Sequence, residues 1–573
     1  FIDQETETFD IYKYKGPSYS TYPIDDNIQS FSSSKIIVDQ NTNMKIYDYD
    51  SDVSGLQFRG KVDKLITIKN GKIEIGTGNQ KSNIFIGINS GKTAVDTSEN
   101  GIWYNTSIGN DSMSSIVHGQ RNTSIGNQSL KNLTDGIKNV AIGSESSKLL
   151  TDGSMNVSIG NKSMYSGNGS RNIAIGDESL YYSTKNDNVA IGLQSNYQNV
   201  YGDSNISLGN YSLLLNDSSR NIAIGHNSLY SNKINDNIAI GYNAGYKTIS
   251  GGDNIMIGQD SNYNNEYGTE SISIGSKALY KNDASKNLAI GYYAGYNTKE
   301  DDNIAIGWKA GFENIHGKYN TSLGNRALYS NDVSFNTAVG YQTLFNTRSI
   351  NNTALGYRAG FINVSGTDNT AIGTEALRQN QYGTQNTTVG SNSLYTNDAS
   401  FNTAVGYQSL HKNIDGSSNA ALGWKSSYNN EHGEFNVAIG PQSLFNSDNS
   451  ENTAVGFRSL YTNSLGSSNT AIGFKSEYLN QHGTENVAIG SGSLYTNDNS
   501  QNVAIGYQSA YNSTSEGITS IGWKSLFNNT NGNNNLSIGK SSLFTNTTGS
   551  ENISIGNLSL YNSNSSINVA VGN

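Results

Sequence analysis

The chain has no cysteine and only three prolines among its 573 residues. The lack of cysteine excludes a disulfide framework and thiolate metal sites. No apolar run approaches the roughly 18 residues of a membrane helix, so we expect no membrane span. The formal charge is -10 at pH 7 and no basic cluster is visible. Nucleic acid is therefore not expected as a partner.

Hydrophobic residues are also scarce. They make up 34% of the chain, and the mean hydropathy is -0.53. Such a composition is thin for a globular core, and disorder is the simplest explanation of so polar a chain. A regular internal repeat argues strongly against disorder, because a narrow stacked core needs few apolar residues in each repeat.

The repeat is a five-residue phrase, Asn-x-Ala-Ile-Gly or a close variant. It occupies residues 139–143, 336–340 and 568–572, among many others. Its closing glycines, from Gly109 to Gly572, number 29 and lie 16 or 17 residues apart. This regularity predicts an all-β parallel β-roll or β-solenoid of about 29 rungs, where a rung is one repeat. Such a stack more often presents a surface than builds one catalytic pocket.

Each rung is expected to contain two short strands. The first covers the Val-Ala-Ile segment, and the second covers the segment that includes Leu410 and its equivalents. Alternation along the first strand predicts that Val140 and Ile142 face the core, whereas Ala141 faces a close neighbour. The repeated asparagine suits a turn, and stacked copies of it could form amide ladders.

Rungs also resemble each other at every third step, with spacings of 49 or 50 residues such as Gly225 to Gly275. One chain winding three units per turn is therefore a rival architecture. The 66-residue step from Gly324 to Gly390 would break that register. We therefore favour one rung per coil. Because such a coil is narrow, we expect several chains to share a core as a homotrimeric fibre.

The chain divides into three parts. Residues 1–70 show no period and are expected to form an N-terminal attachment or capping segment that docks to a particle or cell surface. Residues 71–103 form a transition to the first rungs. Residues 104–573 form the β-roll repeat array.

The fuller repeat, at residues 452–461 (Asn-Thr-Ala-Val-Gly-Phe-Arg-Ser-Leu-Tyr), resembles two groups of fibre repeats. One group is the head of trimeric autotransporter adhesins, the Yersinia-type left-handed parallel β-roll. The other is the viral and bacterial tail-fibre proteins, which often carry endosialidase-type chaperones. The resemblance covers residues 104–573. It implies an extracellular homotrimer on a virion or cell surface that mediates attachment to a host or other surface.

Asparagines in Asn-x-Ser/Thr sequences are frequent, and Asn105, Asn132, Asn386 and Asn546 are examples. Many arise by chance in a chain so rich in asparagine, serine and threonine. In a host that glycosylates proteins, these asparagines would be sugar sites.

A column of aromatic residues directly follows the repeat glycine, and several of them precede a lysine or arginine. Such a stripe could stack on the rings of a host glycan. An aromatic ladder or cation–π pairs that only support the fold are the alternative. The candidate binding residues are Trp308, Tyr357, Tyr407, Trp424, Phe457, Phe474 and Trp523.

Four histidines precede a glycine in the turns: His118, His316, His432 and His482. Tyrosines occupy the same column in other rungs, so the position favours a flat ring rather than a metal ligand. No paired carboxylates and no Ser-His-Asp set stand out. We therefore expect no enzyme, no catalytic residue, no metal and no cofactor. A glycan-binding or glycan-degrading fibre, a depolymerase, is the alternative.

Overall fold

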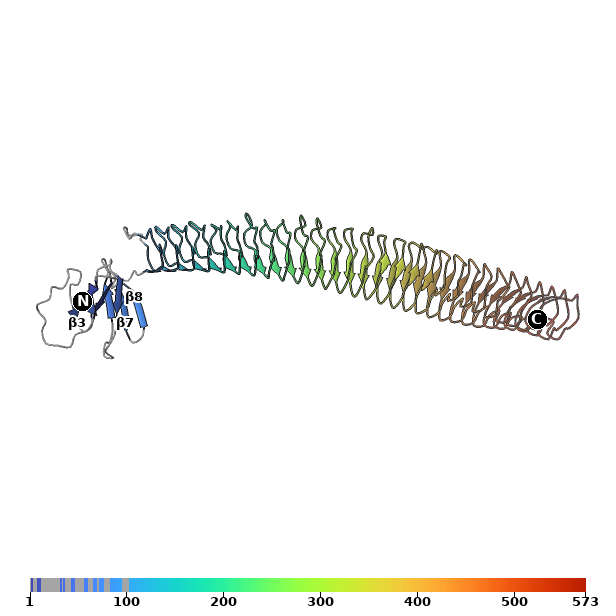
Figure 1. The fold of residues 1–573 in the computed structure, drawn as a ribbon. Helices are drawn as coiled ribbons and strands as arrows, with labels where there is room; N and C mark the ends of the chain where they lie inside the picture. The colour runs from blue at the N-terminus through green and yellow to red at the C-terminus, as the bar shows by residue number, and fades with distance from the viewer. Residues whose placement is uncertain are drawn as a thin grey trace. The chain divides into compact units, whose positions relative to one another are not determined.

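The computed structural model describes residues 83–94 and 102–573, and the backbone of eight strands before them. The chain forms two units, Phe1–Asp236 and Asn237–Asn573. The described residues contain strands and turns but no helix. In each unit the repeats form a parallel β-solenoid, whose stacked coils are visible in Figure 1. The predicted all-β solenoid is therefore confirmed.

The first unit contains three small sheets and one ladder of parallel strands. The sheets join β1 to β2 and β5, β3 to β4, and β6 to β7 and β8. The strands are β1 (Ile2–Asp3), β2 (Thr8–Ile11), β3 (Phe31–Ser32), β4 (Lys35–Ile36), β5 (Asn43–Ile46), β6 (Leu56–Arg59), β7 (Leu65–Lys69), β8 (Lys72–Gly76), β9 (Ile84–Ile86), β10 (Thr106–Ile108), β11 (Thr123–Ile125), β12 (Val140–Ile142), β13 (Val157–Ile159), β14 (Ile173–Ile175), β15 (Val189–Ile191), β16 (Ile206–Leu208) and β17 (Ile222–Ile224).

The second unit contains one long ladder and a second, short ladder. The long ladder comprises β18 (Ile238–Ile240), β19 (Ile255–Ile257), β20 (Ile272–Ile274), β21 (Leu288–Ile290), β22 (Ile304–Ile306), β23 (Thr321–Leu323), β25 (Thr337–Val339), β27 (Thr353–Leu355), β29 (Thr370–Ile372), β31 (Thr387–Val389), β32 (Thr403–Val405), β33 (Ala420–Leu422), β34 (Val437–Ile439), β35 (Thr453–Val455), β36 (Thr470–Ile472), β37 (Val487–Ile489), β38 (Val503–Ile505), β39 (Thr519–Ile521), β40 (Leu536–Ile538), β41 (Ile553–Ile555) and β42 (Val569–Val571). The short ladder comprises β24 (Ser330–Asn331), β26 (Asn346–Thr347), β28 (Ile362–Asn363) and β30 (Gln379–Asn380).

Consecutive repeats pair directly and in register. Ala404 of β32 lies opposite Ala421 of β33, which in turn lies opposite Ala438 of β34. One repeat therefore makes one coil, and the rival winding of three units per turn is wrong. The array also begins before residue 104, because β9 pairs in parallel with β10. This first rung falls in the predicted transition, and the attachment role of residues 1–70 lies outside the described residues.

The predicted orientation of the first strand is wrong. Ala141 is fully buried, whereas Ile142 is 36% exposed and Val140 is half-buried. The interior of the coil is a slot that leaves little room beside the alanine. A Cβ atom placed on Gly360 in the opposite wall would lie 3.8 Å from the Ala354 Cβ. The alanine methyls and the buried leucines of the opposite wall fill this slot, so the larger β-branched residues point outward.

This inverted alternation leaves an aliphatic surface along the three-residue strands of each unit, which we call the aliphatic face. It consists of the third residues of these strands and of the first residues where they are aliphatic; in several strands, such as β25, the first residue is threonine. In the second unit the third residues that are exposed by 36% to 46% are Ile240, Ile274, Ile290, Leu323, Leu355, Val389, Val405, Leu422, Ile439 and Ile472.

The expected second strand around Leu410 is also wrong. Gln408 and Leu410 instead have positive φ angles of 54° and 48°. This left-handed conformation costs a non-glycine residue about 1–2 kcal/mol. Rung-to-rung hydrogen bonds offset part of that cost, since the Leu410 N–H donates to the Ser426 carbonyl at 2.9 Å. The segment is therefore a stacked turn.

The repeated asparagines form the expected amide ladder. The Asn139 N–H and Nδ2 both donate to Oδ1 of Asn122, at 2.8 and 3.1 Å. Asn139 Nδ2 also donates to the Gly153 carbonyl at 2.8 Å. Each asparagine thus satisfies buried backbone groups of the coils next to it. The sequon residues Asn105 and Asn386 belong to this ladder and are buried. They are not sugar sites in the folded chain.

The repeat glycines allow the coils to approach each other closely. Gly406 has a φ of 130°, and a Cβ atom there would lie 2.5 Å from the Gly423 carbonyl oxygen of the next coil. Any side chain would therefore force adjacent coils apart, which explains why glycine recurs at this position. No helix in the described part of the chain is long and apolar enough to cross a membrane.

Candidate functional site

The predicted aromatic residues share one column, because each directly follows the glycine that ends a strand. Six of them are exposed, from 37% for Trp308 to 53% for Phe474, and Phe457 is half-buried. Phe457 and Phe474 stack with ring centroids 5.5 Å apart. Within the described part of the chain, they are the only two of the seven that stack on each other. Tyr357 and Trp523 stack on other members of the column, at 5.5 and 6.4 Å.

A longer aromatic ladder lies five residues after the repeat glycine. Its rings stack coil upon coil, with centroids 4.7 to 5.3 Å apart in the second unit. Sequence reasoning missed this ladder, although the recurring Leu-Tyr and Leu-Phe pairs were its signal. Its members in the second unit are Tyr246, Tyr263, Tyr280, Tyr296, Phe312, Tyr329, Phe345, Phe361, Tyr395, His411, Tyr428, Phe445, Tyr461, Tyr478, Tyr495, Tyr511, Phe527, Phe544 and Tyr561.

Two positions of this ladder hold residues other than tyrosine or phenylalanine. Arg378 separates Phe361 from Tyr395, and its guanidinium carbon lies 5.9 and 5.2 Å from their centroids. His411 stacks on Tyr428 at 5.0 Å, and burial lowers the pKa of its imidazole. The ladder thus accepts any planar group that can stack, whether charged or neutral.

Lysines and arginines bridge the two aromatic columns. The Lys425 ammonium lies 5.4 Å from the Trp424 ring centroid and 5.3 Å from that of Tyr428. The Arg458 guanidinium carbon lies 5.1 Å from Phe457 and 5.2 Å from Tyr461. Such cation–π contacts contribute roughly 0.5–1 kcal/mol each at exposed sites. The cation column, defined as the lysines and arginines of the second unit two positions after the repeat glycine, comprises Lys277, Lys309, Arg326, Arg358, Lys425, Arg458, Lys475 and Lys524.

The turn histidines pair with aspartates of adjacent coils rather than with each other. His316 Nδ1 lies 2.8 Å from an Asp332 oxygen, and His432 Nδ1 lies 2.6 Å from Asp415. The hydrogen bond with Asp415 raises the pKa of His432. No group of three or more His, Cys, Asp or Glu side chains suited to a metal occurs among the described residues. The turn histidines therefore join adjacent coils.

One carboxyl group is buried in the core. Glu477 takes the position that leucine holds at 460 and 494, and its side chain is fully buried. Burial raises its pKa to about 8, although hydrogen bonds from Asn486 and Asn480 oppose that change. Oε2 has no hydrogen-bond partner. A neutral carboxylic acid is therefore the favoured form in this rung near neutral pH.

In comparisons with known proteins, no protein family model, no curated protein and no solved structure matches the chain.

Proposed function

We propose that the chain is a structural surface fibre, a homotrimeric shaft that projects from a virion or cell and mediates attachment to a host or surface. The observation that carries this proposal is the exposed aliphatic face. Val405, Leu422 and Ile439 occupy successive strands of one ladder and are 36%, 39% and 40% exposed. A continuous apolar stripe of this kind marks an interaction surface, whereas single exposed apolar residues do not.

The period of the aliphatic face favours a second and third copy of the same chain as its partners. Adjacent strands lie about 4.8 Å apart. A partner must repeat at that spacing to match the stripe over many coils, and another copy of the solenoid does so. Closed cyclic symmetry would then bury the stripes around one axis. The resemblance of the repeats to trimeric adhesin heads and tail fibres agrees with three copies.

Mass measurement with matched variants tests the assembly. We expect a trimer of the 61.6 kDa chain by light scattering. Changing Ile439→Lys and Ile472→Lys places charge on the aliphatic face and should yield monomers. The control changes Leu465→Lys and Leu479→Lys, which are 61% and 40% exposed and lie outside the strands of the ladder. A wild-type monomer, or an Ile439/Ile472 variant that stays trimeric, would refute the proposed interface.

Antibody labelling tests the surface location. Gold-labelled antibodies raised against residues 237–573 should bind intact particles or cells of the source from outside. Binding only after the particles or cells are opened would refute a projecting fibre. The depolymerase alternative predicts new reducing ends when the purified fibre is incubated with capsular polysaccharide.

A further inference from the structure

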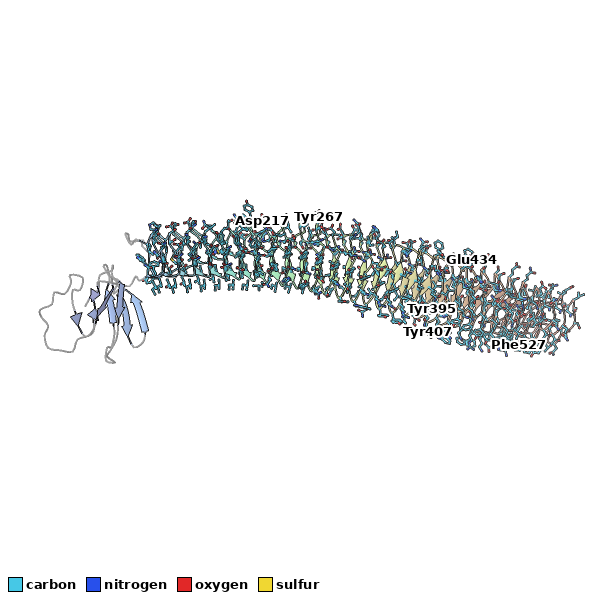
Figure 2. All side chains as sticks on the ribbon, viewed as in Figure 1. Asp217, Tyr267, Tyr395, Tyr407, Glu434 and Phe527 are labelled. Atoms are coloured by element: carbon cyan, nitrogen blue, oxygen red, sulfur yellow. The ribbon has the colours of Figure 1, made fainter. Side chains whose placement is uncertain are left out.

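Charge is unevenly distributed between two sides of the coils in the second unit. Most lysines and arginines lie in the cation column and beside it, whereas most acidic residues lie in the turns that precede the repeated asparagine; Asp260 and Glu375 are exceptions, since each stands two positions after a repeat glycine. Glu431, Glu434 and Glu451 are examples of this acidic side. Figure 2 shows Tyr407 and Phe527, from the two aromatic columns, at one edge of the second unit and Glu434 at the opposite edge. A chain with a net negative charge thus carries a locally positive surface.

The cation column is held in place without carboxylate partners. Lys475 Nζ lies 5.5 Å from the Phe474 centroid and 5.2 Å from that of Tyr478. Arg458 Nε donates to Gln442 Oε1 at 2.7 Å. Among the described residues, no member of the column forms an ion pair with aspartate or glutamate. Their charges are therefore fixed by neutral neighbours and remain available to an outside anion.

The neighbouring rings add to this preference for anions. In the aromatic ladder, ring faces are covered by the rings of adjacent coils; Tyr478, for instance, stacks between Tyr461 and Tyr495 at 5.2 and 5.1 Å. Such rings turn their edges outward, and the edge of an aromatic ring carries partial positive charge. Along the aromatic ladder, a ligand can thus meet cations and positive ring edges, but it finds few open ring faces on which to stack.

We propose that the cation column of the second unit binds a linear acidic polysaccharide that runs along the coils. Carboxylate or sulfate groups would pair with successive lysines and arginines, and the added contacts along one polymer would raise its affinity. One extended sugar unit is about as long as one coil is thick, so anionic groups and cations can meet repeatedly. This proposal names the ligand of the attachment fibre and in that sense rests on the proposed function.

Single-stranded nucleic acid fits this surface less well. Proteins that bind it without sequence preference stack its bases on open aromatic faces, and the ladder faces are already covered. Acidic polysaccharide needs only charge pairing and is therefore the favoured ligand.

Binding of the full chain to immobilised polymers at about 150 mM salt tests the proposal. The probes are hyaluronan, which carries carboxylates; heparin, which also carries sulfates; dextran, which is neutral; and a thymidine oligonucleotide. We expect binding to hyaluronan, heparin or both, and none to dextran. Changing Lys425, Lys475 and Lys524 together to Gln should weaken binding at least tenfold.

The matched control changes Lys286, Lys299 and Lys318 to Gln, which removes the same charge outside the column. An equal loss in this control, no binding to either acidic polysaccharide, or stronger binding to the oligonucleotide would overturn the proposal. Light scattering on the same samples reports assembly independently. A trimer that binds no polyanion overturns only this inference, whereas a monomer that binds through the cation column overturns only the proposed trimer.

Discussion

Replacing Glu477 should abolish a pH dependence of stability that the wild-type array shows in one rung. Glu477 is fully buried among the alanines and leucines of the core, in a position that Leu460 and Leu494 fill in adjacent coils. An ionised carboxylate at such a site would be desolvated without a cation to pair with. The folded rung therefore holds the proton to a higher pH than the unfolded chain does.

The two pKa values set the sign and size of the effect. The carboxyl has an ordinary pKa of 4.5, and burial raises it to about 8 in the folded state. Between these values the folded chain binds a proton that the unfolded chain has released, so the free energy of unfolding falls as pH rises. The stabilisation is complete below pH 4.5 and is lost as pH approaches 8. At about 1.4 kcal/mol per pKa unit, the loss amounts to about 5 kcal/mol.

Hydrogen exchange read by mass spectrometry measures this loss locally, because each rung contacts only its neighbours. Wild type and Glu477→Gln are compared at pH 5 and again at pH 8.5, so that intrinsic exchange rates cancel at each pH. We expect the amides of residues 473–490 to lose protection in the wild type, relative to the variant, as pH rises. Glu485→Gln alters an exposed carboxylate of the same coil and should behave as wild type. If the ratio of exchange rates between wild type and Glu477→Gln in this segment does not change with pH, the reasoning is refuted.

Three further outcomes follow from coil-to-coil contacts. Asn436→Ala leaves the buried Asn452 N–H without its acceptor at 2.9 Å, so urea unfolding should show a loss of about 1–3 kcal/mol. Arg378→Phe completes the ring stack with two new ring pairs, so the free energy of unfolding should rise by about 1–3 kcal/mol and the melting temperature should rise with it. A lower melting temperature would show that arginine packs between the two rings better than phenylalanine does. By NMR titration, His432 should have a pKa above the ordinary histidine value, and Asp415→Asn should lower it.

The repeat and its spacing predicted the coil, but not which side of the strand faces inward. Alternation shows that Ala404 and Val405 point to opposite sides, and burial of the larger residue is the usual expectation. Here Leu410 projects from the opposite wall and leaves room only for the alanine methyl. Only the distance between the two walls decides this, and a single strand pattern contains no information on that distance.

The candidate site was partly predictable. The column after the glycine was visible because Trp308 and Trp424 stand in register, and their lysines suggested the cation–π contacts that the structure contains. The stacked ladder that includes Tyr461 and Tyr495 was also visible in the sequence, because in many rungs an aromatic residue follows the buried leucine, as it does after Leu460 and Leu494. The contact of His316 with Asp332 was not predictable. Rungs of 16 and of 17 residues both occur, so the sequence alone does not show which residue of the adjacent coil lies beside a given histidine.

Aspartate contacts join the turns of adjacent coils. Asp498 accepts hydrogen bonds from the N–H groups of Gln481 and His482, at 2.6 and 2.7 Å. Asp332 does the same for the turn that contains His316 in the preceding coil. A coil with the Asn-Asp turn thus follows a coil whose turn ends in histidine or tyrosine and glycine. The chain itself fixes the order of the coils. Because the buried residues are similar in every coil, these variable turns supply the contacts that are specific to one pair of neighbours.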